Sequence, residues 1–85
     1  MSHLIVTVDP HSPASRSGIK AGDRLARING VTVIDFIDYQ ALSADSRLTV
    51  RVLRDGQTLD FSIRKEEYAP LGLNFSTPMM SGTRL

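Results

Sequence analysis

Two apolar-alternating segments joined by Asp55-Gly56 constrain the fold of this 85-residue chain more than any other feature. Asp-Gly is a preferred two-residue turn between antiparallel strands. Period-two alternation turns one face of each strand toward a core. Residues 48–63 are therefore predicted to form a β-hairpin with one buried face. The alternating apolar residues are Leu48, Val50 and Val52 before the turn, and Leu59, Phe61 and Ile63 after it.

Three shorter strands are predicted before this hairpin. The β-branched run at 3–8 predicts a buried strand, which must break ahead of Pro10. A strand at 25–28 leads through Asn29-Gly30, a strong hairpin signal, into a strand at 31–33. The core is predicted to consist of the following residues: Leu4, Val6, Leu25, Ile28, Leu42, Val50, Val52 and Phe61.

Two helices of unequal length are predicted between the strands. The short one begins at Ser12, a good N-cap that is followed by Pro13 at the first helical position, and it ends at Gly18. The longer one is amphipathic and covers 35–44, with Asp35 as its cap. Short strands with two helices predict a small α+β barrel or sandwich of five to six strands.

Composition and charge exclude several classes of function. Eighty-five residues can bury only one modest core, so we expect a single domain. The net charge of +1 predicts no strong field for nucleic acid or a membrane surface. Without cysteine there is no disulfide and no thiolate metal site. The N-terminal apolar run is too short for a signal peptide or a membrane span, and we expect a cytoplasmic monomer.

The ordered motifs at 12–33 resemble the PDZ domain family, and the resemblance extends from residue 4 to about residue 65. In that family Ser-Pro-Ala opens the short helix, a glycine ends it, Gly-Asp starts the next strand, and Ile-Asn-Gly makes the following turn. The segment "VLRDGQ" (52–57) resembles the usual PDZ hairpin. The matching residues here are Ser12-Pro13-Ala14, Gly18, Gly22-Asp23, Ile28-Asn29-Gly30 and Val33.

This resemblance implies a non-catalytic module that binds a protein or peptide C-terminus. PDZ domains add an extended peptide as an extra strand at a sheet edge, and a glycine-containing loop before the groove strand presents N–H groups to the terminal carboxylate. No such loop precedes Leu4. The stretch "PLGL" at 70–73 is the candidate loop, and 74–77 is the candidate groove strand. The resemblance therefore implies a circularly permuted PDZ domain over 1–77, with 78–85 as a tail or the start of a linker.

The residues that the resemblance assigns to peptide binding come from this loop, this strand and the longer helix. Pro70 departs from the family pattern, since it replaces a glycine and removes one N–H donor. The helix also lacks the histidine that marks one ligand class, so we predict only a hydrophobic C-terminal residue on the ligand. Asp38 and Leu42 are the alternatives for the helix positions. The assigned residues are Leu71, Gly72, Leu73, Asn74, Phe75, Ile37 and Ala41.

A narrower resemblance involves the C-terminal stretch 71–84, which has the pattern LGL-F-TP-M-G-R. It is similar to the end of the N-terminal PDZ-like domain in a clostridial-type family of iron–sulfur proteins related to radical-SAM enzymes. In that family a cysteine cluster follows, and none is present in this chain. The alternative function is therefore a docking or regulatory domain of a larger iron–sulfur enzyme, without free-peptide binding. A structural domain with an unused groove is a third hypothesis.

Catalytic and metal-binding chemistry finds little support in the sequence. His3, Asp9 and His11 have no recognised ligand spacing, and we expect them to be solvated loop residues. Ser12 lies beside His11 but is better explained as a helix cap than as a nucleophile. We therefore predict no catalysis, no metal and no cofactor for this chain alone.

Overall fold

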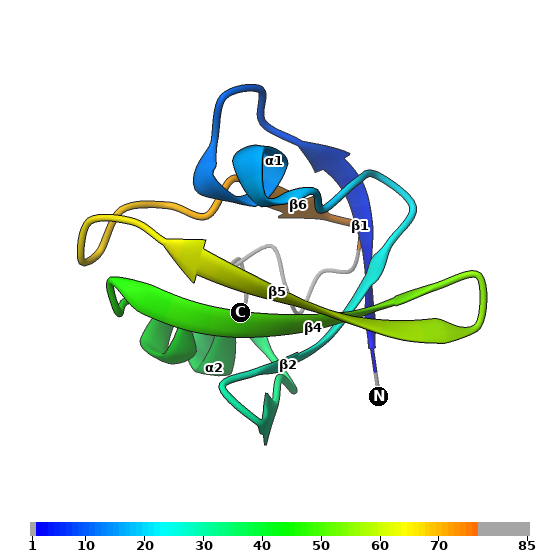
Figure 1. The fold of residues 1–85 in the computed structure, drawn as a ribbon. Helices are drawn as coiled ribbons and strands as arrows, with labels where there is room; N and C mark the ends of the chain where they lie inside the picture. The colour runs from blue at the N-terminus through cyan, green and yellow to red at the C-terminus, as the bar shows by residue number, and fades with distance from the viewer. Residues whose placement is uncertain (1, 77–85) are drawn as a thin grey trace.

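The computed structural model describes residues 2–76, and it contains all of the predicted strands and helices. The boundaries differ from the predicted ones by no more than two residues within this part of the chain. Residues 77–85, which include the predicted tail and the end of the predicted groove strand, lie outside the described residues. Figure 1 shows the elements in the following order: β1 (His3–Val8), α1 (Pro13–Ser17), β2 (Arg24–Ile28), β3 (Val31–Thr32), α2 (Phe36–Leu42), β4 (Arg47–Arg54), β5 (Gln57–Arg64) and β6 (Leu73–Phe75).

The strands form one antiparallel sheet in the order β5-β4-β2-β1-β6, with β3 paired to β2 beside this path. Helix α1 lies between the two ends of the curved sheet (Figure 1). It packs against β5, and its Ala14 N–H donates to the Leu71 carbonyl just before β6 at 3.0 Å. The sheet therefore curls into a partly open barrel that α1 helps to close. This confirms the predicted small α+β fold.

Helix α1 has the caps that the sequence predicts. The Ser12 hydroxyl accepts a hydrogen bond from the Ser15 N–H at 3.1 Å, and Pro13 occupies the first helical position. Gly18 ends the helix in a left-handed conformation with φ of 110°, and its N–H donates to the Ser15 carbonyl. These local interactions fix a helix of only five residues, which could not persist without its neighbours.

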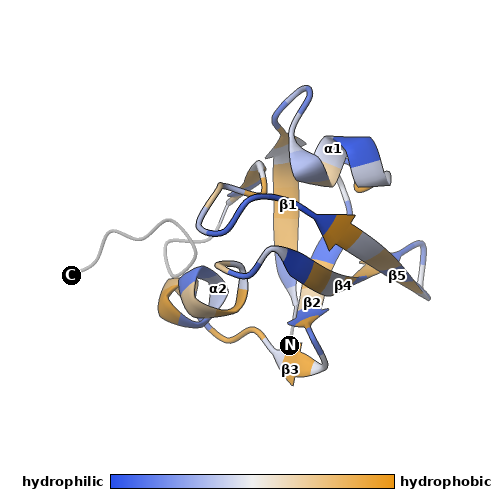
Figure 2. Ribbon diagram, turned by 60° about the vertical axis from the view of Figure 1, so that its left-hand side comes forward, coloured by the Kyte–Doolittle hydropathy of each residue, from blue (hydrophilic) through white to orange (hydrophobic). Residues whose placement is uncertain are grey.

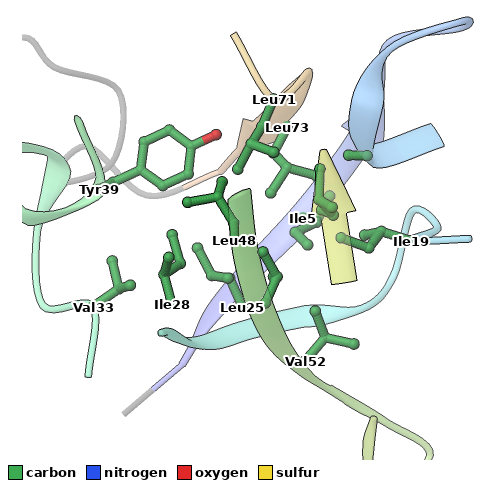
Figure 3. Packing of buried hydrophobic residues seen from close by; sticks show 13 residues of the cluster. Ile5, Ile19, Leu25, Ile28, Val33, Tyr39, Leu48, Val52, Leu71 and Leu73 are labelled. Carbon is green, nitrogen blue, oxygen red and sulfur yellow. The ribbon is translucent and has the colours of Figure 1, made fainter. Parts of the chain in front are cut away.

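The hydrophobic core lies inside the curl of the sheet (Figure 3). Four of the predicted core residues are fully or almost fully buried, namely Leu25, Ile28, Val50 and Val52. Two others, Leu42 and Phe61, are half-buried and pack against the core. Figure 2 shows that the apolar residues are concentrated in the strands, while the loop before α1 is mostly hydrophilic.

The prediction that Leu4 and Val6 of β1 point into the core is wrong. Ile5 is fully buried, whereas Val6 is 42% exposed and Leu4 is half-buried. His3 is not a solvated loop residue either, because it is buried in β1 and its Nε2 lies 2.8 Å from the Val33 carbonyl oxygen. The run at 4–6 is apolar at every position, so it carries no alternation that would fix its phase. Pairing of β1 with β2 and β6 decides which side chains point inward.

A partly buried ion pair joins the turn after α1 to the β4–β5 hairpin. The Arg54 guanidinium donates to both Asp23 carboxylate oxygens, at 2.7 and 2.6 Å, and to the Gly18 carbonyl at 3.0 Å. The Lys20 N–H also donates to the Asp23 carboxylate at 2.9 Å. The Arg54 hydrogen bonds hold the pKa of Asp23 below its usual range, against the opposing effect of burial. This pair fixes the position of α1 relative to the sheet.

Candidate peptide-binding groove

The turn before β6 can exist only with glycine at position 72. Gly72 has φ of 96°, in the left-handed region that other residues avoid. A Cβ atom at this position would overlap the Ser12 side chain, so the turn lies directly against the N-cap of α1. Glycine therefore allows the backbone to adopt this conformation and to approach α1 closely.

Two backbone carbonyl groups of this turn accept hydrogen bonds from neighbouring elements. The carbonyl of Leu71 accepts from Ala14, and the carbonyl of Gly72 accepts from the Asp9 N–H at 2.8 Å. Across a trans peptide the following N–H points in the opposite direction. The N–H groups of Gly72 and Leu73 are therefore turned away from α1 and β1.

The pairing of β6 with β1 supports this orientation. Leu73 lies opposite Val8, and the Asp9 N–H donates to the residue before Leu73. A pair flanked in this way does not use its own N–H and C=O groups in the antiparallel ladder. Both groups of Leu73 therefore face the outer edge of β6, which is an end strand of the sheet. This edge can accept another strand.

A groove of about 590 Å³ lies beside the start of β6 and extends to α2. The loop after β5 holds the two sides in place, because the Tyr68 N–H donates to the Ala44 carbonyl just after α2 at 2.8 Å. Most of the lining is apolar or small. The lining residues are Asp9, Phe36, Tyr39, Gln40, Ala41, Ser43, Ala44, Tyr68, Ala69, Pro70, Leu71, Gly72, Leu73 and Asn74.

Helix α2 presents a stripe with helical spacing to this groove, at Phe36, Tyr39, Gln40 and Ser43. Ala41 lines the groove, as the resemblance implies, but Ile37 does not, since its side chain is 74% exposed. The alternatives Asp38 and Leu42 are not among the lining residues either.

Tyr39 packs α2 against β6. Its ring packs edge-on against Phe75, with 5.3 Å between the ring centroids and 79° between the planes. Sequence reasoning did not assign Tyr39 to the site, although it lies three residues after Phe36, at the spacing that shares a helix face.

The residues predicted in the loop and the groove strand are brought together at one end of the groove. Leu71, Gly72, Leu73 and Asn74 all line it, while Phe75 packs beside it on Tyr39 and His3. Leu71 is almost fully buried, so it also belongs to the core.

One charged side chain, Asp9, is found among the lining residues, and sequence reasoning missed its place there. The Asn74 side-chain amide donates to its carboxylate at 2.9 Å. Its negative charge gives this end of the groove a polarity that a ligand must match.

Known proteins place this chain in a family. The sequence pattern of the PDZ domain matches residues 4–54. The chain belongs to the PDZ domain family. The PDZ domain of HtrA3, in a crystal structure with a phage-derived ligand (FGRWV), superposes with a TM-score of 0.65 at 28% sequence identity. That match covers 96% of this chain and 68% of the HtrA3 chain.

Curated relatives of this PDZ domain are proteases. A candidate zinc metalloprotease of Rhizobium meliloti is 33% identical over 81% of this chain. The periplasmic serine endoprotease DegP of Escherichia coli is 32% identical over 75%, and human serine protease HTRA3 is 38% identical over 69%. The matched segments make up 20%, 14% and 13% of these relatives, so this chain spans a fifth of their length or less.

Residues 2–76 were searched for clusters of metal ligands and for helices that could span a membrane. In this part of the chain no group of three or more His, Asp or Glu side chains could hold a metal ion. His3 is bound to Val33, Asp9 to Asn74, and His11 is exposed. Neither described helix is long and apolar enough to cross a membrane.

Proposed function

We propose that this PDZ domain binds the C-terminal segment of a protein or peptide as an added strand along the outer edge of β6. The observation that carries the proposal is the orientation of the Gly72 and Leu73 N–H groups, which face away from their own sheet beside the groove. A terminal carboxylate accepts hydrogen bonds from such paired amides, and ladder bonds to Leu73 would align the rest of the peptide.

The groove favours a ligand whose last side chain is apolar. Leu71 and Leu73 line the groove beside the turn, and Ala44 lines it just after α2. An aliphatic terminal side chain placed there would lose water contact without leaving a polar group unpaired. The ligand of the HtrA3 PDZ domain also ends in an aliphatic residue, valine.

We propose in addition that the chain is a circularly permuted PDZ domain, in which the groove strand comes last. Support comes from β6, which follows β5 in the sequence and pairs with β1. The Phe75 ring also lies 6.4 Å from the His3 ring, so the two ends of the described chain are close together.

The second candidate function is docking within a longer chain. Its support is that the matched segments make up only a small part of each relative's chain. In that case a segment of the same protein would occupy the groove, and catalysis would belong to another domain. A reading frame that continues beyond Leu85 into closely spaced cysteines would favour this candidate.

Titration with a C-terminal peptide library, followed by amide chemical shifts, tests the main proposal. Each peptide is used with a free carboxylate and with an amidated end. We expect free-carboxylate peptides with an apolar last residue to shift the Gly72 and Leu73 amide signals, and amidated peptides to bind at least tenfold more weakly. Equal binding of both forms, or no shifts at any concentration, would exclude carboxylate recognition.

A further inference from the structure

The side chain of Tyr39 presents a buried hydroxyl group for which the described residues offer no partner. The residue is only 9% exposed. Among residues 2–76 no hydrogen bond involves its hydroxyl. Burial and the charge of Asp9 are the two causes that shift the pKa of Tyr39, and no hydrogen bond contributes to the shift. A buried hydroxyl without a partner costs about 1–3 kcal/mol, and such groups are uncommon in folded proteins. The packing of the ring on Phe75 does not require this hydroxyl, since phenylalanine would pack in the same way.

The hydroxyl points toward the end of the groove where the peptide backbone is expected to terminate. In Figure 3 the oxygen of Tyr39 is directed toward Leu71 and Leu73. All three residues line the groove, and the outward N–H groups of Gly72 and Leu73 belong to this same end. The hydroxyl, carried by α2, and the two N–H groups, carried by the turn before β6, therefore line the same groove.

The hydroxyl is suited to donate a hydrogen bond rather than to carry charge. Burial raises the pKa of Tyr39 above its ordinary value, and the negative charge of Asp9 raises it further. The hydroxyl therefore remains protonated at neutral pH. A carboxylate only accepts hydrogen bonds, so a protonated hydroxyl complements it.

A further donor is useful at this end for two reasons. Pro70 has no N–H group, so the turn offers fewer donors than a loop without proline. Asp9 also lines the groove and disfavours a second negative charge nearby. Additional hydrogen bonding would offset that repulsion.

We propose that the Tyr39 hydroxyl donates a hydrogen bond to the terminal carboxylate of the ligand, alongside the Gly72 and Leu73 amides. The inference rests on the proposed function and goes beyond it by assigning a side chain of α2 to carboxylate recognition. Tyr39 is then a specificity-determining residue that distinguishes a free C-terminus from an internal or amidated segment.

The substitution Tyr39→Phe tests the inference, because it removes the hydroxyl and keeps the ring against Phe75. Binding of one peptide with an apolar last residue is measured by calorimetry, in its free-carboxylate and amidated forms. Hydrogen bonds to charged groups support an expected loss of about ten- to a hundredfold for the free-carboxylate form. The amidated form should change by less than about twofold, so that the ratio between the two forms falls.

The outcomes separate this inference from the proposed function. If the wild-type domain binds both peptide forms equally, carboxylate recognition itself is wrong. If the wild-type domain prefers the free carboxylate and Tyr39→Phe keeps the whole preference, the inference about Tyr39 is wrong. An equal loss for both forms assigns Tyr39 to packing and also overturns the inference.

A measurement on the wild-type domain provides a readout that does not depend on folding of the variant. The ¹³Cζ signal of Tyr39 reports hydrogen bonding of its hydroxyl. We expect this signal to shift on addition of the free-carboxylate peptide and to stay in place with the amidated one. Identical behaviour with both peptides would contradict a bond between the hydroxyl and the carboxylate.

Discussion

At the scale of single residues, Gly72 connects the fold to the groove. Its left-handed backbone turns two N–H groups outward, and its missing side chain allows contact with Ser12. Alanine in a left-handed conformation costs about 1–2 kcal/mol, and the overlap with Ser12 adds to this. We therefore expect Gly72→Ala to lower the free energy of unfolding by more than 2 kcal/mol and to abolish peptide binding, as measured by urea unfolding and titration.

Gly56→Ala provides the matched control for this prediction. Gly56 also has a positive φ, 76°, but a Cβ atom there would meet open space. Gly56 lies in the β4–β5 turn, away from the groove. We therefore expect Gly56→Ala to lower the free energy of unfolding by only the cost of a left-handed backbone, about 1–2 kcal/mol. Equal losses in the two variants would show that contact with Ser12 does not constrain position 72.

At the scale of elements, the Asp23–Arg54 pair joins the turn after α1 to the β4–β5 hairpin. Asp23→Asn removes the charge, and we expect it to lower the free energy of unfolding by about 1–3 kcal/mol near neutral pH. The pKa of Asp23 is lowered in the folded state, mainly by the Arg54 hydrogen bonds. Stability from this pair is therefore present above the ordinary carboxyl pKa and is lost as the pH falls through the lowered one.

Urea unfolding at pH 7, 5 and 3 checks this prediction. The difference between wild type and Asp23→Asn should be largest at pH 7 and should narrow below about pH 4. Asp60→Asn is the matched control, because Asp60 pairs with Arg51 at the surface, where both side chains are nearly half exposed. Its effect should be small and sensitive to salt. A difference that is constant from pH 7 to pH 3 would contradict the assigned role of Asp23.

Across the whole molecule, the sequence predicts those elements whose signals are local. The caps of α1 and the turns at Asn29-Gly30 and Asp55-Gly56 were predicted correctly because each depends on two or three neighbouring residues. The buried face of β1 was not, because residues 4–6 are all apolar, and Tyr39 was not assigned to the groove. Ile5 and Tyr39 point inward through pairing and packing with strands far away in the sequence.

The difference between local and long-range signals also explains which residues of the candidate groove could be predicted from the sequence. The glycine at 72 carries a local signal, and so does the short strand after it. Asp9 enters the groove only because β1 pairs with β6, which brings it beside Asn74, 65 residues later. No pattern within either segment predicts that contact.

The proposed permutation leads to a test on the whole chain. Phe75 pairs with Ile5 across the β1–β6 ladder, and the rings of Phe75 and His3 are 6.4 Å apart. A short Gly-Asn linker could therefore join Ser76 to His3 as a hairpin. A rearranged chain would begin at Glu66, pass through Ser76 and the linker to His3, and end at Lys65.

We expect the rearranged chain to fold with a free energy of unfolding within about 2 kcal/mol of the parent, because all described strand pairs remain and only one exposed loop is opened. It should also keep the preference for free-carboxylate peptides. Urea unfolding and the same peptide titration measure both properties. The new chain ends lie in the loop at 65–66. This loop is held near the end of α2 by hydrogen bonds from the Lys65 N–H to the Ser46 carbonyl and from the Tyr68 N–H to the Ala44 carbonyl. If the rearranged chain folds but loses the preference, continuity of this loop positions the groove, and strand order alone does not determine binding.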